Sequence, residues 1–200
     1  MSVINSLQQK LAENEVDGLL IASGINRRYA TGFTGSAGAL LLTENEALFI
    51  TDFRYTEQAT EQVGHCKIIK QNGTLAQEIA NQAKTLNIKR LGFEKNKVTY
   101  AEYEMYQDLL PEVDLVPVSQ LVESLRLIKT EEEIAIMKKA AQIADEAFSY
   151  IQSVIKPGIA EIDISNELEF FMRKQGLCRL HLILSSHRVI DLPPARCCFR

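Results

Sequence analysis

The sequence predicts an α/β fold with a mixed sheet, followed by a second domain. Helix-like and strand-like segments alternate over about the first 128 residues, which is typical of a layered α/β domain. Two apolar runs, residues 39–43 and 47–51, are separated by three polar residues. This pattern predicts a hairpin, so the sheet is not all parallel. A stronger helical pattern begins at Thr130. We therefore expect domains at residues 1–128 and 129–200.

The elements of the first domain follow from the spacing of its apolar residues. Residues 3–11 carry apolar side chains at helical spacing, and residues 19–22 form a short apolar run that predicts a buried strand. Residues 23–38 contain glycine and serine and are interpreted as a tight loop that packs on the sheet. Asp52 is placed to cap a helix over about residues 53–63. Further strands are expected at residues 67–70, 90–94 and 115–118, and further helices at residues 74–86 and 99–110.

The second domain begins after a short helical linker at residues 119–128. Thr130 and Glu133 have the spacing of a capping box, in which each side chain binds the other residue's backbone N–H. Apolar residues then recur at three- and four-residue steps and share one helix face. Pro157 and Gly158 interrupt the chain, and a second amphipathic helix is expected from about Ile162 to Lys174.

Composition excludes several classes of protein. The chain has 200 residues, with 22 basic and 26 acidic side chains, and no basic block suggests nucleic-acid binding. No apolar stretch approaches the ~20 residues that span a bilayer, and the N-terminus does not resemble a signal peptide. Four cysteines are too few and too clustered for a disulfide scaffold. We therefore expect a cytoplasmic protein with no nucleic-acid or membrane partner.

Two segments are candidates for ligand contact. Glycines at positions 32, 35 and 38 suggest a phosphate-binding loop, but such a loop must run from a strand into a helix, and here a strand is expected next. Arg54 lies between two aromatic residues, Phe53 and Tyr55. An arginine can bind a carboxylate through two parallel hydrogen bonds, although a surface or interface ion pair is more common. Arg54 and Tyr55 are therefore our candidates for contact with a substrate or a neighbouring subunit.

No convincing metal site is found. The acidic residues at 131–133 are better explained by the helix dipole, which favours acidic side chains in a first turn. The pair His65 and Cys66 is isolated in the sequence. Residues at the end of the chain offer a zinc interpretation, but adjacent cysteines fit one tetrahedral ion poorly; these residues are Cys178, His181, His187, Cys197 and Cys198.

Several segments together resemble the aminopeptidase P/prolidase/creatinase family, and in particular bacterial Xaa-Pro dipeptidases and aminopeptidases. The resemblance implies a creatinase-type N-terminal domain followed by the beginning of a "pita-bread" α+β catalytic domain. Each segment is weak alone, but together they occur in the family's order. The segments are residues 26–38, 49–55, 91–94, 125–134, 140–145 and 156–176.

The resemblance implies hydrolysis of the peptide bond before proline, with two divalent metals such as manganese or cobalt. The family's ligands are two aspartates, a histidine and two glutamates, all downstream of the matched segments. No catalytic residue, metal ligand or cofactor is therefore expected in this chain, and whether it is an enzyme itself is left open. Family N-terminal domains help to form dimers, so a homo-oligomer through this domain is expected.

The resemblance ends near Gly176, and residues 177–200 are interpreted as an aberrant tail. We hypothesise that the tail is translated in a shifted reading frame, because suitable synonymous codons read in other frames give family-like sequence. The main expectation is a fragment of an Xaa-Pro peptidase that is inactive alone. The alternatives are a non-catalytic interaction or oligomerisation module that pairs with a full-length relative, and a zinc-binding structural protein.

Overall fold

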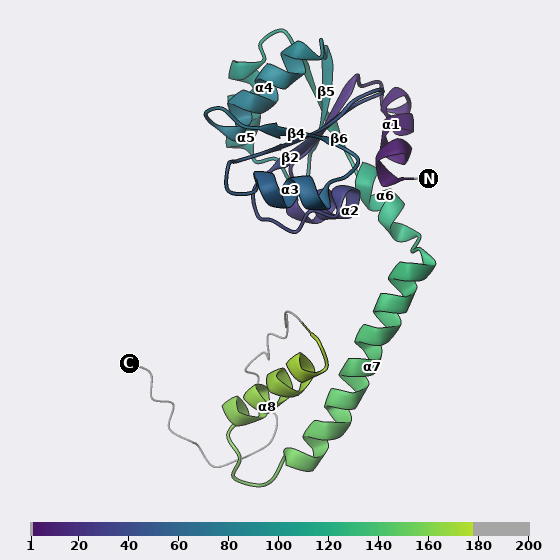
Figure 1. The fold of residues 1–200 in the computed structure, drawn as a ribbon, viewed down its shortest axis with the longest axis vertical. Coiled ribbons are helices and arrows are strands. Elements are labelled where there is room, and N and C mark those ends of the chain that lie inside the picture. Colours follow the sequence, from purple (N-terminus) through teal and green to yellow (C-terminus); the bar gives the residue numbers. More distant parts are fainter. Residues whose placement is uncertain (1, 178–200) are drawn as a thin grey trace. The chain divides into compact units, whose positions relative to one another are not determined.

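The computed structural model describes residues 2–177 and divides into two compact units, the first ending at Ile128 and the second beginning at Lys129 (Figure 1). Helices and strands alternate through the first unit, as its sequence predicts. In chain order its elements are α1 (Val3–Glu13), β1 (Gly18–Ile21), α2 (Gly24–Thr31), β2 (Ala39–Thr43), β3 (Ala47–Thr51), α3 (Thr56–Gln62), β4 (Lys67–Lys70), α4 (Leu75–Thr85), β5 (Arg90–Glu94), α5 (Tyr100–Leu109), β6 (Asp114–Val118) and α6 (Leu121–Leu127).

Within the described residues the strands form one six-stranded sheet in the order β4-β3-β2-β1-β5-β6. The pairs β1–β2 and β2–β3 are antiparallel, and the other three pairs are parallel. The predicted hairpin is present, with Leu40 of β2 opposite Phe49 of β3. The prediction of an α/β fold with a mixed sheet is therefore confirmed.

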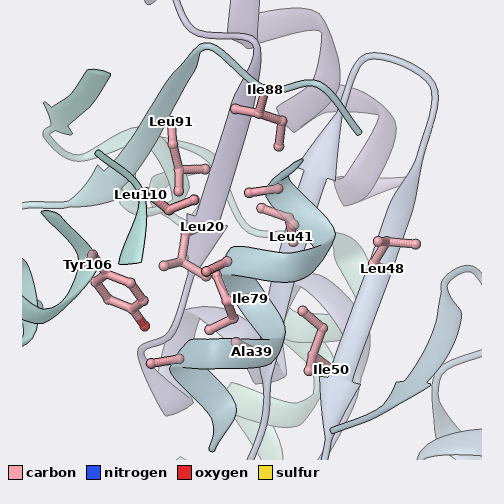
Figure 2. Packing of buried hydrophobic residues seen from close by; sticks show 13 residues of the cluster. Leu20, Ala39, Leu41, Leu48, Ile50, Ile79, Ile88, Leu91, Tyr106 and Leu110 are labelled. Carbon is pink, nitrogen blue, oxygen red and sulfur yellow. The ribbon is translucent and has the colours of Figure 1, made fainter. Parts of the chain in front are cut away.

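Both faces of the sheet are covered, because alternate side chains of the central strands enter two different cores. Leu20 of β1 packs under α4, whose Ile79 is fully buried (Figure 2). Leu19 and Ile21 point to the other face, where α1 supplies Leu7. Burial on both faces explains why the central strands read as uninterrupted apolar runs instead of alternating apolar and polar residues.

The segment of residues 23–38, which was expected to be a loop, contains helix α2, so that expectation is wrong in its first half. The Ser23 hydroxyl oxygen accepts a hydrogen bond from the Asn26 N–H and caps the helix. Gly32 ends it with a φ of 78°, a left-handed conformation that glycine adopts without strain. The buried residues of α2 are Asn26 and Arg27, so the helix lacks the apolar stripe by which helices are recognised.

The prediction that Asp52 caps the following helix is also wrong. Helix α3 begins at Thr56, its N-cap residue is Tyr55, and that residue makes no side-chain capping hydrogen bond. The Asp52 carboxylate instead accepts hydrogen bonds from the backbone N–H and the guanidinium of Arg54. Because the helix begins four residues after Asp52, this carboxylate is not at the cap position and binds Arg54 within the preceding turn.

The second unit contains two helices among its described residues, α7 (Glu131–Val154) and α8 (Glu161–Lys174). The predicted capping box of Thr130 and Glu133 is confirmed, and both of its hydrogen bonds are present. The two helices pack through Ile143, Ala147 and Met172. Several large apolar side chains are nevertheless exposed, namely Ile136, Met137, Phe148, Ile162 and Phe170.

Candidate functional site

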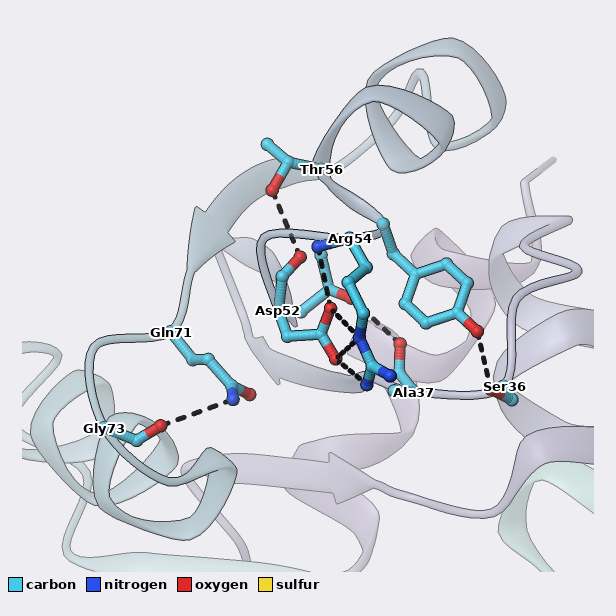
Figure 3. Close-up of polar contacts among 9 residues, drawn as sticks. Ser36, Ala37, Asp52, Arg54, Thr56, Gln71 and Gly73 are labelled. Carbon is cyan, nitrogen blue, oxygen red and sulfur yellow. Dashed lines mark hydrogen bonds and ion pairs between the residues drawn. The ribbon is translucent and has the colours of Figure 1, made fainter.

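The candidate contact residues lie on a short turn between β3 and α3, shown in Figure 3. Asp52 binds Arg54 closely: Nη2 lies 2.6 Å from Oδ2, and Nε lies 3.2 Å from Oδ1. The Arg54 backbone N–H donates to the same carboxylate at 2.9 Å. The hydrogen bond from the Arg54 side chain lowers the pKa of Asp52, and the carboxylate in turn raises the pKa of Arg54. Both groups are therefore charged at neutral pH.

This ion pair limits what Arg54 can bind. Its Nε and Nη2 already engage a carboxylate, so the same edge cannot hold a second carboxylate through two hydrogen bonds. The Arg54 side chain is still 64% exposed, and the neighbouring Phe53 is 72% exposed. A binding partner would therefore contact the ring of Phe53 and the part of the Arg54 guanidinium that does not bind Asp52. The hydrogen bonds between Asp52 and Arg54 hold this turn in place.

Tyr55 connects this turn to the loop that follows α2. Its hydroxyl lies 2.8 Å from the Ser36 hydroxyl oxygen, and its ring packs edge-on against Phe33 with centroids 5.9 Å apart. Gly35 lies beneath both rings, where a Cβ atom would be 2.4 Å from the ring of Phe33 and 2.9 Å from that of Tyr55. Any larger residue at this position would therefore require the rings or the loop to move. Arg54 and Tyr55 are neighbours in the sequence, and contacts with Asp52, Ser36 and Phe33 hold the turn that carries both.

A second polar cluster, which sequence reasoning missed, lies at the start of α2. The buried Asn26 amide donates to Glu94 Oε1 at 2.6 Å and to Glu123 Oε1 at 2.8 Å, and its oxygen accepts from Arg126 at 3.1 Å. Glu94 Oε2 also accepts from the N–H groups of residues 22 and 23. Burial acts to raise the pKa of Glu123, but the Asn26 hydrogen bond and nearby basic groups outweigh it, and the pKa is lowered.

Asn26 and Glu94 are 68 residues apart in the sequence, so no local pattern links them. The sequence offered only two separate signals, namely polar residues in the first turn of α2 and a glutamate, Glu94, at the end of β5. The cluster joins α2, β5 and α6 within the first unit. Because every group in it is hydrogen-bonded to another, we assign it a structural role.

Among the described residues, no group of three or more His, Cys, Asp or Glu side chains could hold a metal ion. Glu133 serves the helix cap, and Asp52 is bound by Arg54. Cys66 packs against two of the apolar clusters, and burial raises the pKa of its thiol to about 11. The candidate zinc ligands in the tail lie outside the described residues. No helix in residues 2–177 is long and apolar enough to cross a membrane.

Comparison with known proteins identifies the family. Residues 4–128 match the Creatinase/Prolidase N-terminal domain, and residues 135–190 match the Metallopeptidase family M24. The chain is 50% identical over 173 residues to the uncharacterized peptidase YqhT of Bacillus subtilis, covering 86% of this chain and 49% of that protein. The chain thus spans about half the length of the curated relatives that it matches.

Solved structures agree with this assignment. An Xaa-Pro dipeptidase from Bacillus anthracis is 48% identical with a TM-score of 0.83, over 87% of this chain and 49% of that one. The N-terminal domain of the cytoplasmic peptidase PepQ from Mycobacterium tuberculosis is 32% identical with a TM-score of 0.58, over 62% of this chain and 97% of that domain.

The mixed sheet and its covering helices are therefore those of an N-terminal α/β domain of the creatinase/prolidase type. More particularly, the chain belongs to the aminopeptidase P/prolidase family, through its creatinase/prolidase N-terminal domain. The resemblance seen in the sequence is confirmed.

Proposed function

We propose that this chain corresponds to the N-terminal part of an Xaa-Pro peptidase, an enzyme that hydrolyses the peptide bond before proline. The observation that carries this proposal is the similarity to the Xaa-Pro dipeptidase from Bacillus anthracis, which extends over 87% of this chain and crosses from the first unit into the second. The substrate of the full-length enzyme to which this chain corresponds is then an Xaa-Pro peptide.

The catalytic metals are proposed to bind outside the described residues. The family resemblance implies two divalent ions, such as manganese or cobalt, which activate a water molecule for attack on the amide bond. The residues present do not fit such a pair, because no three potential ligands converge in the described part of the chain. We therefore propose that the chain alone does not hydrolyse Xaa-Pro peptides.

A chimera tests the proposal directly. Residues 1–177 of this chain would replace the matching part of the Bacillus anthracis Xaa-Pro dipeptidase, and the intact dipeptidase would serve as the control. We expect hydrolysis of Xaa-Pro dipeptides that depends on added manganese or cobalt. A folded, metal-loaded chimera that cleaves no Xaa-Pro substrate would refute the assignment.

The exposed turn supports a second candidate function, a non-catalytic module that pairs with a full-length relative or forms a homo-oligomer. Exposed aromatic and arginine side chains on a fixed turn are typical of residues that contribute strongly to protein interfaces. Phe53 and Arg54 have this character, and Tyr55 is fixed beside them by Ser36. We therefore propose Arg54 and Tyr55 as contact residues toward a partner subunit or its substrate.

Co-purification tests this second function. The tagged chain would be expressed together with an untagged full-length relative, alongside the Arg54→Ala variant and a control variant, Thr60→Ala, at an exposed position of α3. Pairing that is lost with R54A and kept with T60A would support the contact role. Equal recovery of the relative with all three chains would exclude Arg54 from the interface.

A further inference from the structure

Arg27 is a buried cation that serves no ion pair in the described part of the chain. Its side chain belongs to a residue that is 4% exposed, and burial lowers the pKa of its guanidinium. Nη2 donates to the Gly35 carbonyl oxygen at 2.8 Å, and Nη1 donates to the Gly38 carbonyl oxygen. Nε has no hydrogen-bond partner within residues 2–177. The hydrogen bonds of the guanidinium thus go to two backbone carbonyls, while its charge also interacts with the ring of Phe33, 5.7 Å away, and with the carboxylate of Glu94.

Such an arrangement is a poor source of stability. Burying a charge is costly even when a carboxylate compensates it, and the hydrogen-bond partners of Arg27 are neutral carbonyl groups. What a guanidinium supplies here is geometry, because its planar fork can hold two acceptors in fixed positions, as an ammonium cannot. The two acceptors, Gly35 and Gly38, lie at either end of one short loop.

The loop of residues 35–38 in turn supports the turn that carries the contact residues. The Ser36 hydroxyl bonds to the Tyr55 hydroxyl, and the Ala37 carbonyl oxygen accepts from Thr51 Oγ1 at 2.9 Å (Figure 3). Thr51 and Tyr55 lie on either side of the Asp52–Arg54 pair. The loop is therefore hydrogen-bonded both to Arg27 and to the residues at the two ends of the turn.

We propose that Arg27 is a positioning residue for the turn of residues 52–55. Its guanidinium fixes the 35–38 loop, and that loop fixes Thr51 and Tyr55, between which Arg54 is presented. The functional importance of this role rests on the proposed contact function of Arg54 and Tyr55. The geometric role itself does not depend on that function.

Limited proteolysis with trypsin measures this role, because the turn carries its own cleavage site. Arg54 is exposed, but a protease must draw several flanking residues into an extended conformation, so cleavage after Arg54 reports opening of the turn. The appearance of the new N-terminus at Tyr55 would be followed by mass spectrometry. Cleavage after Arg90, at the start of β5, would serve as the reference for opening of the sheet.

We expect Arg27→Met to raise the rate of cleavage after Arg54 by about tenfold or more, because two charge-assisted hydrogen bonds to the loop are lost. The urea midpoint should fall as well, because the carbonyls of Gly35 and Gly38 lose their donors. The rate after Arg90 should rise much less than the rate after Arg54. Arg27→Lys keeps the charge but loses the fork, so it should restore slow cleavage only in part. The matched control is Arg28→Met, at the adjacent exposed position, which should leave cleavage after Arg54 unchanged.

Two results would overturn the proposal: an unchanged rate after Arg54, or rates after Arg54 and Arg90 that rise in the same proportion. The second result would mean that Arg27 supports the whole fold and not the turn. If R27M does not fold, R27K decides by the same comparison of the two sites. Selective loosening in R27M, combined with normal partner pairing in R54A, would reject the contact function and keep the positioning role.

Discussion

Replacing Asn26 with alanine tests whether the polar cluster at the start of α2 holds the first unit together. The side-chain amide of Asn26 joins three elements, because it binds Glu94 of β5 and both Glu123 and Arg126 of α6. The residue is 1% exposed, so water cannot simply take the place of the amide. Alanine would remove all three hydrogen bonds and keep the helix backbone.

The expected loss follows from the charge of the partners. Hydrogen bonds to charged groups contribute about 1.5–3 kcal/mol each, and a buried group left unpaired adds a further cost. Glu94 keeps its two backbone donors, and Glu123 and Arg126 are only partly buried, so both can reach water. We therefore expect a decrease in unfolding free energy of about 3–4 kcal/mol, less than the full sum.

Urea unfolding followed by circular dichroism measures this loss. With a denaturant slope of about 2 kcal/mol per M, the midpoint should fall by about 1.5–2 M. The control is Asn81→Ala, at an exposed position of α4, which should change stability by no more than about 0.5 kcal/mol. A loss below about 1 kcal/mol in N26A would refute the claim that this cluster fastens α2 and α6 to the sheet.

Three further predictions follow from the geometry of the first unit. Because Arg54 lowers the pKa of Asp52, the stability that this carboxylate contributes is present above about pH 4 and is lost as the pH falls through its folded-state pKa. The difference in melting temperature between wild type and Asp52→Asn should therefore shrink below about pH 4, and a constant difference from pH 7 to 3 would contradict this. Gly35→Ala places a Cβ atom 2.4 Å from the ring of Phe33, so it should destabilise the fold by about 1–3 kcal/mol in urea unfolding; a neutral effect would show that the loop moves freely. Since burial raises the pKa of the Cys66 thiol to about 11, its alkylation by iodoacetamide at pH 8, located by mass spectrometry, should be slow in the folded chain and fast in urea; equal rates would mean that the thiol is exposed.

The sheet and most helices could be predicted because local sequence patterns determine them. Residues 19–21 of β1 and 39–42 of β2 are all apolar, since neighbouring residues such as Leu19 and Leu20 face different cores, and this pattern is typical of strands buried on both faces. The start of α7 could likewise be predicted from nearby residues, because Thr130 and Glu133 form its capping box. In these elements the residues that form the structure are neighbours in the sequence.

The remaining features depend on contacts between distant residues. Helix α2 was missed because its buried residues, Asn26 and Arg27, are polar and find their partners on β5, on α6 and in the following loop. Of the candidate site, sequence reasoning named Arg54 and Tyr55. It could not give the pairing of Arg54 with Asp52, because the same aspartate also fits the pattern of a helix cap.

The most direct test of the central claim is Xaa-Pro dipeptide hydrolysis by the purified 200-residue chain with added manganese or cobalt. The Bacillus anthracis Xaa-Pro dipeptidase, assayed in parallel, shows that substrate and metal are competent. We predict no turnover by the chain alone, because the proposal places the catalytic metals outside the residues of this chain that the structure describes. Metal-dependent turnover that co-elutes with the pure chain would contradict the account and would mean that this chain builds a catalytic site of its own.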